Sequence, residues 1–353
     1  MNAIAASGGG ASSVVIRPVA PADLEAVLVL WRDAMGDHYP LTLDVLSMVL
    51  ERNPSMRSGD ALVAVDAGSG RTLGFGYLTL QRLPDEQLEN FRDRAHLQAI
   101  VVDPAHRRLG IGRALAGRLA EVARREGRIL VEAGSGFFYL WPGIPTDLEG
   151  AEAFARAVGL EPASVSFDLR GDVGGIEIGP ADRHSLATAG LRVDRAAADD
   201  IDQLLEYLYR EFGGEWWHDI RWLLAEGLDP AALVVLRTAA GEIVGHARIH
   251  RPTDRPIAPP LFWSGLRGPN AGGLGPIGVA ASIRGRGLGH ALLVAALAEL
   301  RVAGLSDVVI DFTTLLDFYG PVGFQPWMTF RHAHGSIQNV LAATRTAATT
   351  GHR

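Results

Sequence analysis

The stretch that decides the fold occurs twice, as Arg107-Arg108-Leu109-Gly110-Ile111-Gly112 and as Arg284-Gly285-Arg286-Gly287-Leu288-Gly289. Both have arginine first, glycine fourth and sixth, and an aliphatic residue fifth. Each copy follows an apolar, strand-like run and opens a helix-like run. The first reads LQAIVVDPAHRRLGIGRALAGRLAEVARREG and the second LGPIGVAASIRGRGLGHALLVAALAELRVAG. Free N–H groups at a helix N-terminus favour an anion, and glycines allow the backbone to approach it closely. The repeat therefore predicts a duplicated fold with one anion-binding loop in each half.

The duplication extends well beyond the two loops. A strand and an amphipathic helix begin at Val14 and again at Leu191, and strand–turn–strand segments typical of β-hairpins begin at Ala61 and Ala232. The helices after the loops are expected to end near Gly127 and Gly304, and the last helices near Gly159 and Gly323. Both halves thus share the order β, α, β-hairpin, β, Gly loop, α, β, α, β, which predicts an α/β protein with a mixed sheet in each half.

The length of 353 residues favours about two domains, and the repeat supplies their boundaries. The sequence predicts an N-terminal domain at 14–170 and a C-terminal domain at 191–338. Residues 171–190, which are rich in glycine and weakly periodic, are expected to form a linker. Residues 1–13 and 339–353 are expected to form tails.

Composition excludes several kinds of chemistry. The chain has no cysteine and no lysine, so disulfides, thiolate catalysis, a phosphate-binding P-loop lysine and a Schiff-base lysine are ruled out. The histidines show no tight ligand spacing, and we therefore expect no metal site. A net charge of −7 without a basic block argues against nucleic acid. No apolar run reaches the roughly 18 residues that span a bilayer, and no signal peptide is evident, so a cytoplasmic protein without membrane contact is expected.

A dinucleotide-binding loop is the competing interpretation of the glycines. That fingerprint requires glycine or alanine at its third position, whereas Leu115 and Leu292 stand there. The surrounding segments are also rich in hairpins rather than built from successive βαβ units. This interpretation is therefore disfavoured.

At these residues the chain resembles the GNAT acetyltransferase superfamily, whose pyrophosphate loop reads Gln or Arg, two residues, Gly, one residue, then Gly or Ala. Arg107-x-x-Gly110-x-Gly112 and Arg284-x-x-Gly287-x-Gly289 both fit, and the element order matches from about Val14 to Leu169 and from Leu191 to Phe330. The resemblance implies two tandem GNAT domains and acetyl-CoA, or another acyl-CoA, as acyl donor.

The resemblance also implies which residues hold the cofactor. The pantetheine arm is expected along the strand before each loop, and the pyrophosphate on the N–H groups of the loop and the first helical turn. The expected residues are Ile100, Val101, Val102, Arg107, Arg108, Leu109, Gly110, Ile111, Gly112 and Arg113 in the first half, and Ile277, Gly278, Val279, Arg284, Gly285, Arg286, Gly287, Leu288, Gly289 and His290 in the second.

The two halves differ in the group that would finish the reaction. Members of this family often use a tyrosine within the motif Phe-Tyr-x-x-x-Gly-Phe as the acid that protonates the departing thiolate. The second half contains Phe318-Tyr319-Gly320-Pro321-Val322-Gly323-Phe324, which matches this motif. Ala155 stands at the corresponding place of the first half and cannot donate a proton. Tyr319 is therefore the candidate acid, with a packed core aromatic as the alternative.

Other side chains are candidates for the acceptor side. Asp311 ends a strand just before Tyr319 and could steer a cationic amine or act as base, unless it is only a strand-end cap. Further candidates in the second half are Glu215, Trp216, Trp217, His218, His246, His250 and Asp254. The first half instead carries an aromatic and proline-rich insert at 134–150, which is expected to be buried and could either fold over the site of that half or form part of the interface between the halves.

These observations predict an acetyl-CoA-dependent N-acetyltransferase acting on a small-molecule amine. The C-terminal domain is expected to catalyse the transfer and the N-terminal domain to bind acetyl-CoA structurally, in a monomer or homodimer. A non-catalytic acyl-CoA-binding protein is the alternative of a different class. Acetylation of a protein substrate is a third hypothesis, for which the sequence offers no docking feature.

Overall fold

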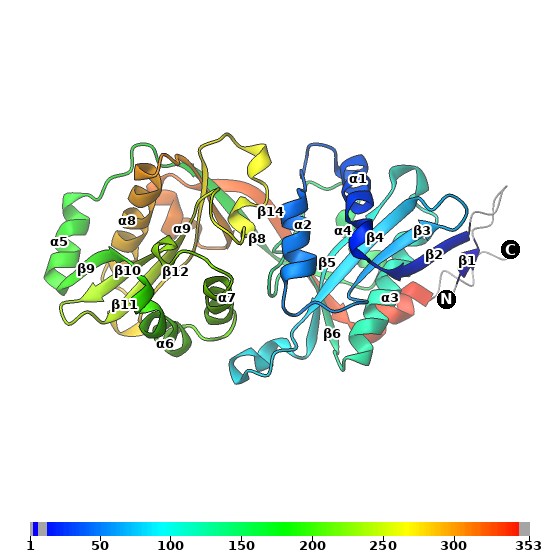
Figure 1. Cartoon of the computed structure of the whole chain (residues 1–353), viewed down its shortest axis with the longest axis horizontal. Helices are drawn as coiled ribbons and strands as arrows, with labels where there is room; N and C mark the ends of the chain where they lie inside the picture. Colours follow the sequence, from blue (N-terminus) through cyan, green and yellow to red (C-terminus); the bar gives the residue numbers. More distant parts are fainter. Residues whose placement is uncertain (1–2, 6–12, 346–353) are drawn as a thin grey trace. The chain divides into compact units, whose positions relative to one another are not determined.

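A computed structural model describes residues 3–5 and 13–345 of the chain (Figure 1). Its packing defines two compact units. Unit 1 comprises the described residues up to Ser166 together with those from Thr329 onward, and unit 2 comprises Phe167–Met328. Both units have a mixed sheet covered by helices, so the predicted α/β class is confirmed.

The sheet of unit 1 contains one parallel strand pair. The strand order is β1-β2-β3-β4-β5-β6-β14, in which β5 and β6 run parallel and the other neighbours antiparallel. The short strand β7 pairs with β14. The strands are β1 (Ala3–Ala5), β2 (Ser13–Pro18), β3 (Ala61–Asp66), β4 (Thr72–Leu80), β5 (Arg94–Val102), β6 (Leu130–Ala133), β7 (Ile144–Pro145) and β14 (Gln325–Ser336).

The sheet of unit 2 repeats this plan. Its order is β8-β13-β12-β11-β10-β9, with β12 and β13 parallel and the other neighbours antiparallel. Strand β8 begins in unit 1 and supplies its second half to this sheet. The strands are β8 (Glu161–Asp172), β9 (Leu191–Arg195), β10 (Leu233–Thr238), β11 (Ile243–His250), β12 (Ala271–Val279) and β13 (Asp307–Thr313).

One long helix follows each glycine loop, as predicted, and can be followed in Figure 1. These helices end where expected, because Gly127 and Gly304 adopt left-handed φ values of 76° and 80°. The helices are α1 (Leu24–Met35), α2 (Leu43–Ser47), α3 (Ile111–Arg125), α4 (Ala151–Ala157), α5 (Pro180–Ala189), α6 (Ile201–Glu211), α7 (Gly214–Ala225), α8 (Leu288–Val302), α9 (Leu316–Tyr319) and α10 (Ile337–Arg345).

Helix α3 packs very closely on the sheet of unit 1. A Cβ atom at Gly74 of β4 would lie 2.9 Å from Ile111 and 3.1 Å from Leu115. Leu115 and Leu119 are fully buried at this contact. Alternate residues of a strand point to opposite faces, so Phe75 and the following odd-numbered positions of β4 face away from α3.

The structure differs from the predicted linker and tails. Helix α5 occupies the second half of the predicted linker 171–190, where Pro180 begins it and Gly190 ends it at a φ of 65°. Helix α10 lies in the predicted C-terminal tail and packs on α3, because Ile337, Val340 and Leu341 form an apolar face. Strand β1 lies in the predicted N-terminal tail, whose residues 6–12 are outside the described part.

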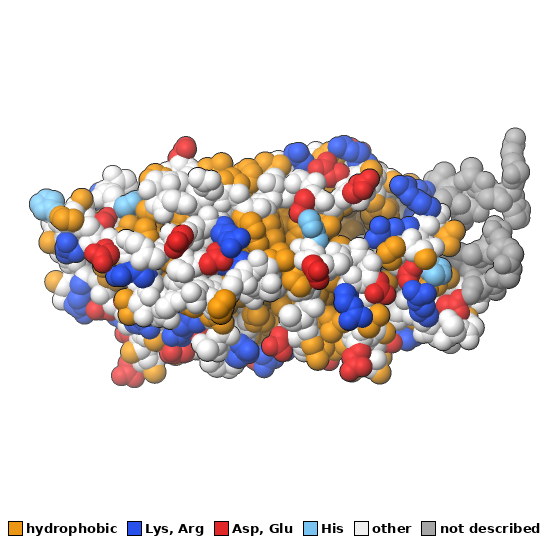
Figure 2. Space-filling model, turned by 90° about the horizontal axis from the view of Figure 1, so that it is seen from above, with side chains coloured by type: hydrophobic (Ala, Val, Ile, Leu, Met, Phe, Trp, Pro, Cys, Tyr) orange, Lys and Arg blue, Asp and Glu red, His pale blue; other side chains and the backbone are white. Residues whose placement is uncertain are grey.

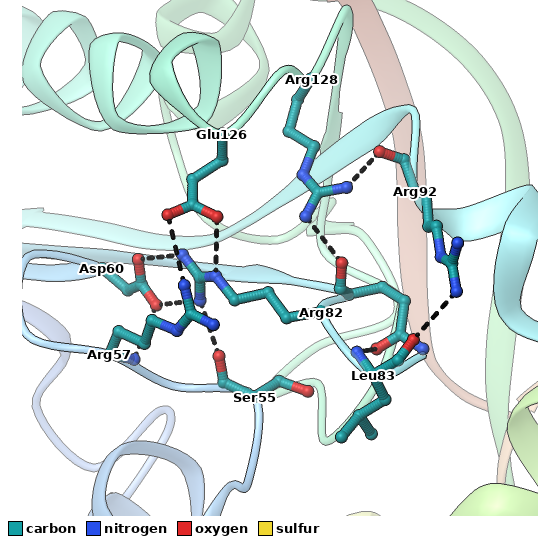
Figure 3. Close-up of polar contacts among 9 residues, drawn as sticks. Ser55, Arg57, Asp60, Arg82, Leu83, Arg92, Glu126 and Arg128 are labelled. Atoms are coloured by element: carbon teal, nitrogen blue, oxygen red, sulfur yellow. Dashed lines mark hydrogen bonds and ion pairs between the residues drawn. The ribbon is translucent and has the colours of Figure 1, made fainter. Parts of the chain in front are cut away.

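A buried ion-pair network closes one end of the sheet of unit 1 (Figure 3). The side chain of Arg82, only 7 % exposed, donates to both carboxylate oxygens of Asp60 at 2.6 and 2.9 Å and to Glu126 at 3.1 Å. It also donates to the carbonyl oxygen of Ser55 at 2.7 Å. Nearby, Arg128 donates to the carbonyl oxygens of Gln81 and Arg92. The network joins the start of β3, the end of β4 and the end of α3.

The surface carries charges of both signs. On the face seen in Figure 2, acidic and basic side chains are interspersed. Among the described helices, none is long and apolar enough to cross a bilayer.

Candidate functional site

In each unit, two parallel strands part near the middle of the sheet. Strand β5 pairs with β6 only over 94–97, and β12 pairs with β13 only over 271–274. Beyond these points β5 continues to Val102 and β12 to Val279, so each presents a strand edge beside the loop. Within the described residues, this geometry leaves one edge of Ile100–Val102 and of Ile277–Val279 without a strand partner, and these are the residues at which an extended ligand arm is expected.

A bulge marks the point of parting in both units. The pairing of β4 with β5 shifts between Tyr77 and Leu78, which leaves Gln98 as the extra residue. The pairing of β11 with β12 shifts between Ala247 and Ile249, opposite Gly275 and Pro276. Because bulges redirect side chains, the residues at these positions decide what faces the parted strands.

The two glycine loops have the same backbone form. Gly110 and Gly287 are the residues before α3 and α8, with left-handed φ values of 85° and 75°. Arg108, at 64°, occupies the position of Gly285, at 72°. The first-turn N–H groups of both helices have no acceptor within the helix, and the loops from 107 to 110 and from 284 to 287 are exposed. This donor set suits a pyrophosphate in both units.

The first arginine of each loop motif is a structural group. Arg107 Nε donates to the carbonyl oxygen of Val102 at 3.3 Å, and Arg284 Nε donates to that of Val279 at 3.2 Å. Both side chains thus hold the loop against the end of its own strand. Both arginines are exposed, so their guanidinium groups stand beside the backbone N–H groups of the same loop.

Asp311 and Tyr319 lie where the strands of unit 2 part. Asp311 follows the last residue of β13 paired with β12, and a Cβ at Gly275 would lie 3.2 Å from its Oδ1. Tyr319 is buried at the end of α9. Burial, with a smaller effect from Asp311, raises the pKa of Tyr319 well above its usual value. The phenol therefore keeps its proton at neutral pH and can donate it.

A row of ionisable side chains on β11 lies beneath α6 and α7. His246, Arg248 and His250 alternate along the strand and are at most 4 % exposed. His246 packs against the rings of Phe212 and Trp216 at centroid distances of 5.1 and 5.8 Å. Burial lowers the pKa of His246 to about 3 and that of His250 well below its usual value. Both imidazoles are therefore neutral at pH 7.

Helix α7 brings two carboxyl groups toward this row. Burial raises the pKa of Glu215 well above its usual value, and Asp219 and Asp311 raise it further. Burial also raises the pKa of Asp219, although its contact with His218 opposes the shift. A carboxyl group with a raised pKa can accept a proton from an amine near neutral pH.

In unit 1, the insert at 134–150 occupies the place that corresponds to this region of unit 2. Gln98 at the bulge donates to the carbonyl oxygen of Ser135 at 2.7 Å and accepts from the N–H of Leu140 at 3.1 Å. These bonds hold the insert against β5. Three of its four aromatic residues are buried, as predicted for the insert: Phe137, Phe138 and Trp141 are 2–6 % exposed, and Tyr139 is partly buried. Ala155 is buried where Tyr319 stands in unit 2.

The sequence candidates are only partly brought together. Asp311, Glu215, His246 and His250 face the same region of unit 2. Asp254 instead forms an ion pair with Arg251 at 2.8 Å, and Trp217 packs edge-to-face against Tyr209. Reasoning from sequence missed Arg248 and Gln98, since their positions depend on strand register and bulges. In the described ranges, no three potential ligands cluster as a metal site would require.

Comparisons with known proteins agree with this geometry. The profile of the acetyltransferase (GNAT) family matches residues 31–135 and 201–324. The mycothiol acetyltransferase of Clavibacter michiganensis subsp. michiganensis is 31 % identical over 258 residues, which are 71 % of each chain. That of Geodermatophilus obscurus is 29 % identical over 64 % of this chain and 69 % of its own.

Solved structures share the fold. A GCN5-related glucosamine N-acetyltransferase region of a fungal multi-domain protein superposes with a TM-score of 0.82 at 23 % identity, covering 93 % of this chain and 39 % of the other. A tandem GNAT protein from the clavulanic acid biosynthesis pathway gives a TM-score of 0.61 at 19 % identity, covering 92 % and 98 %.

The parted strands, the glycine loop before the long helix and the repeat of both define a tandem acyl-CoA-binding fold. The chain belongs to the acetyltransferase (GNAT) family, with two GNAT regions. It is an acetyl-CoA-dependent N-acetyltransferase of the GNAT type, as predicted. The predicted similarity to the layout of mycothiol synthase agrees with the relatives named mycothiol acetyltransferase.

Proposed function

We propose that unit 2 transfers the acetyl group of acetyl-CoA to a small-molecule amine, while unit 1 holds acetyl-CoA without catalysing transfer. The observation that carries this proposal is that two otherwise equivalent sites differ in the ionisable side chains they present. Tyr319 and Asp311 of unit 2 correspond to Ala155 and Gly134 of unit 1. The relatives named mycothiol acetyltransferase support a small-molecule acceptor.

The correspondence follows from strand register. Leu97 pairs with Ala133 and Leu274 with Ile310, so the next residues of β6 and β13 are Gly134 and Asp311. Gly134 has no side chain to offer, and the insert held by Gln98 covers the bulge. Unit 1 therefore has the anion loop but lacks the carboxyl group of Asp311 and the phenol of Tyr319 at the corresponding positions.

The residues of unit 2 suit a direct acyl transfer. The acceptor nitrogen forms a bond to the acyl carbon as the bond from that carbon to sulfur breaks. Tyr319 gives its proton to the departing thiolate. Asp311 attracts the cationic amine and accepts one of the two protons that the nitrogen loses, and the other returns to Tyr319 through water. The residues we propose to hold the donor are those of 100–102 with 107–113 and 277–279 with 284–290.

Thiol release from acetyl-CoA across a panel of small amines tests this proposal. Tyr319→Phe should lower kcat about 100-fold, in the range typical of a lost general acid, with little change in KM for acetyl-CoA. Tyr209→Phe, an exposed tyrosine of the same unit, is the matched control and should behave like the unaltered protein.

Loop variants test the roles of the two units. Gly110→Val and Gly287→Val each replace a glycine at left-handed φ, and native mass spectrometry should show one bound CoA lost in each case. Turnover should fall far more for Gly287→Val. The roles are wrongly assigned if Gly110→Val abolishes turnover and Tyr319→Phe leaves it intact. Release of no thiol with any amine would favour the acyl-CoA-binding alternative.

A further inference from the structure

The central residue of the β11 row, Arg248, is buried without a hydrogen-bond partner. It is 4 % exposed, and its Nε and Nη2 atoms are inaccessible to solvent and bonded to no described group. Burial lowers the pKa of Arg248 only to about 10, so it remains a cation at pH 7. A buried charged donor without an acceptor is costly to a fold, and a purely structural role does not explain its presence.

Arg267 in the same unit shows what a structural buried arginine looks like. Its Nη1 donates to the carbonyl oxygens of Gly272 and Asp307 at 2.9 and 3.0 Å, and its Nη2 donates to that of Pro260 at 2.9 Å. Arg267 therefore ties three backbone segments together through its terminal nitrogens. Arg248 has no such bonds, so its buried donors lack the acceptors that a structural arginine has.

Arg248 lies among the groups proposed to receive the acceptor amine. Asp219 of α7 and Asp311 of β13 are close enough to favour its charged form, as is Asp254. The same two carboxyl groups raise the pKa of Glu215. One region of unit 2 therefore presents a cationic donor beside several carboxyl groups, a pattern that suits a ligand carrying an amine next to an electron-rich oxygen.

The position has no such group in unit 1. Gly74 pairs with Val102 and Gly245 with Val279, and both valines stand eight residues before the glycine that precedes the long helix. Counting from these glycines, His246, Arg248 and His250 correspond to Phe75, Tyr77 and Thr79. The ionisable row is thus a feature of the unit that also carries Tyr319.

We propose that Arg248 is a specificity residue of unit 2, which binds a hydrogen-bond-accepting oxygen of the acceptor molecule beside its reacting amine. This inference rests on unit 2 being the catalytic unit. Glu215, Asp219 and Asp311 receive the amine end of the same molecule. The acceptor is therefore an amine with a carbonyl, carboxamide or carboxylate oxygen close to the nitrogen, rather than a simple alkylamine.

A matched set of amines and a matched pair of variants test the proposal. Isopropylamine, alaninamide and alanine share one carbon skeleton and differ in the oxygen-bearing group. In the full-length protein, Arg248→Met should raise KM for alaninamide and alanine about 10- to 100-fold, as expected when a hydrogen bond to a charged group is lost. The change for isopropylamine should be much smaller. Comparing each variant with the unaltered protein cancels the different basicities of the amines.

Stability separates recognition from a structural role. Replacing a buried, unpartnered cation by an apolar side chain of similar size is commonly neutral or stabilising, so the Tm of Arg248→Met should stay equal or rise. Arg267→Met is the control, which should lower Tm without discriminating among the amines. An equal rise in KM for all three amines, or a Tm loss like that of the control, would overturn the proposal.

The proposal remains testable if no amine is acetylated. Calorimetric titration of the CoA-loaded protein with alaninamide should then show binding that Arg248→Met loses and Arg267→Met keeps. Binding with that pattern and no thiol release would sustain the role of Arg248 and contradict the proposed catalysis. Binding that is absent or insensitive to Arg248 would contradict the inference itself.

Discussion

At the scale of single residues, the two halves differ at positions that the repeat makes equivalent. Asp311 corresponds to Gly134, Tyr319 to Ala155 and Arg248 to Tyr77, while the glycines and the first arginines of the loops agree. The two halves therefore share the backbone of the glycine loops and differ in the side chains that we propose to meet the acceptor. The proposed difference in function between the units rests on these few side chains.

The sequence predicted these residues unequally. The loop glycines and Tyr319 belong to short local patterns, which can be recognised without knowing what packs nearby. Arg248 and Gln98 act through neighbours from other strands. Their roles depend on the register of β11 and on the bulge of β5, and hydrophobic periodicity determines neither.

The network around Arg82 gives a prediction about the stability of unit 1. Arg82→Met should destabilise the fold by about 3 to 5 kcal/mol, because it leaves Asp60, which is 1 % exposed, buried without its cation. Urea unfolding followed by tryptophan fluorescence measures this loss. Arg124→Met is the control, since the pair of Arg124 with Glu121 is largely exposed and should contribute far less to stability. Equal losses of unfolding free energy in the two variants would contradict the claim that burial makes the Arg82 ion pairs important for stability.

At the scale of elements, β11 combines a strand that the sequence predicts with a polar face that it does not explain. The hairpins, the strands before the loops and the helices after them follow from local patterns. Helices α5 and α10 were missed because their apolar faces are short and lie in stretches rich in glycine, alanine or threonine. The partner surface, rather than helix propensity, stabilises such helices.

The buried histidine of β11 predicts a pH-dependent stability for unit 2. His246 has a pKa of about 3 when folded, against about 6.5 when unfolded. Its contribution is therefore fully present above pH 6.5 and is lost as the pH falls toward 3. Between pH 7 and pH 5 the protein should lose about 2 kcal/mol of folding free energy through this residue.

His246→Phe tests that assignment, because Phe75 occupies the equivalent position in unit 1. Both ring nitrogens of His246 lack a hydrogen-bond partner among the described residues, so the exchange removes no bond there. The variant should match the original protein at pH 7 and lose about 2 kcal/mol less on acidification to pH 5. Urea unfolding at both pH values measures the difference. An unchanged loss would show that other groups, such as His250, carry the acid sensitivity.

At the scale of the whole molecule, the units are not two successive halves of the chain. Residues 329–345 belong to unit 1, and the second half of β8 belongs to the sheet of unit 2. The predicted domains at 14–170 and 191–338 remain a proposal about how the repeat is laid out in sequence. A local pattern predicts that a strand exists but leaves open which distant strand pairs with it, so the exchanged segments were beyond sequence reasoning.

The shared segments give the last prediction. A fragment of residues 13–166 lacks β14 and α10, whose Ile337, Val340 and Leu341 pack in the same core as α3. It should fail to form a protease-resistant fold with a cooperative unfolding transition, because that apolar surface of α3 would be open to water.

Returning the missing segment should restore that fold. His332 Nε2 lies 2.9 Å from Ser166 Oγ, so a short Gly/Ser linker can join residues 13–166 to 329–345. This fusion should unfold cooperatively by circular dichroism and resist proteolysis. The same fusion with Val340→Asp and Leu341→Asp is the control and should not. If the 13–166 fragment folds, or if the two aspartates do not impair folding of the fusion, then α10 is not needed to complete the core of unit 1. The expected pattern would mean that its core is completed by residues from the far end of the chain.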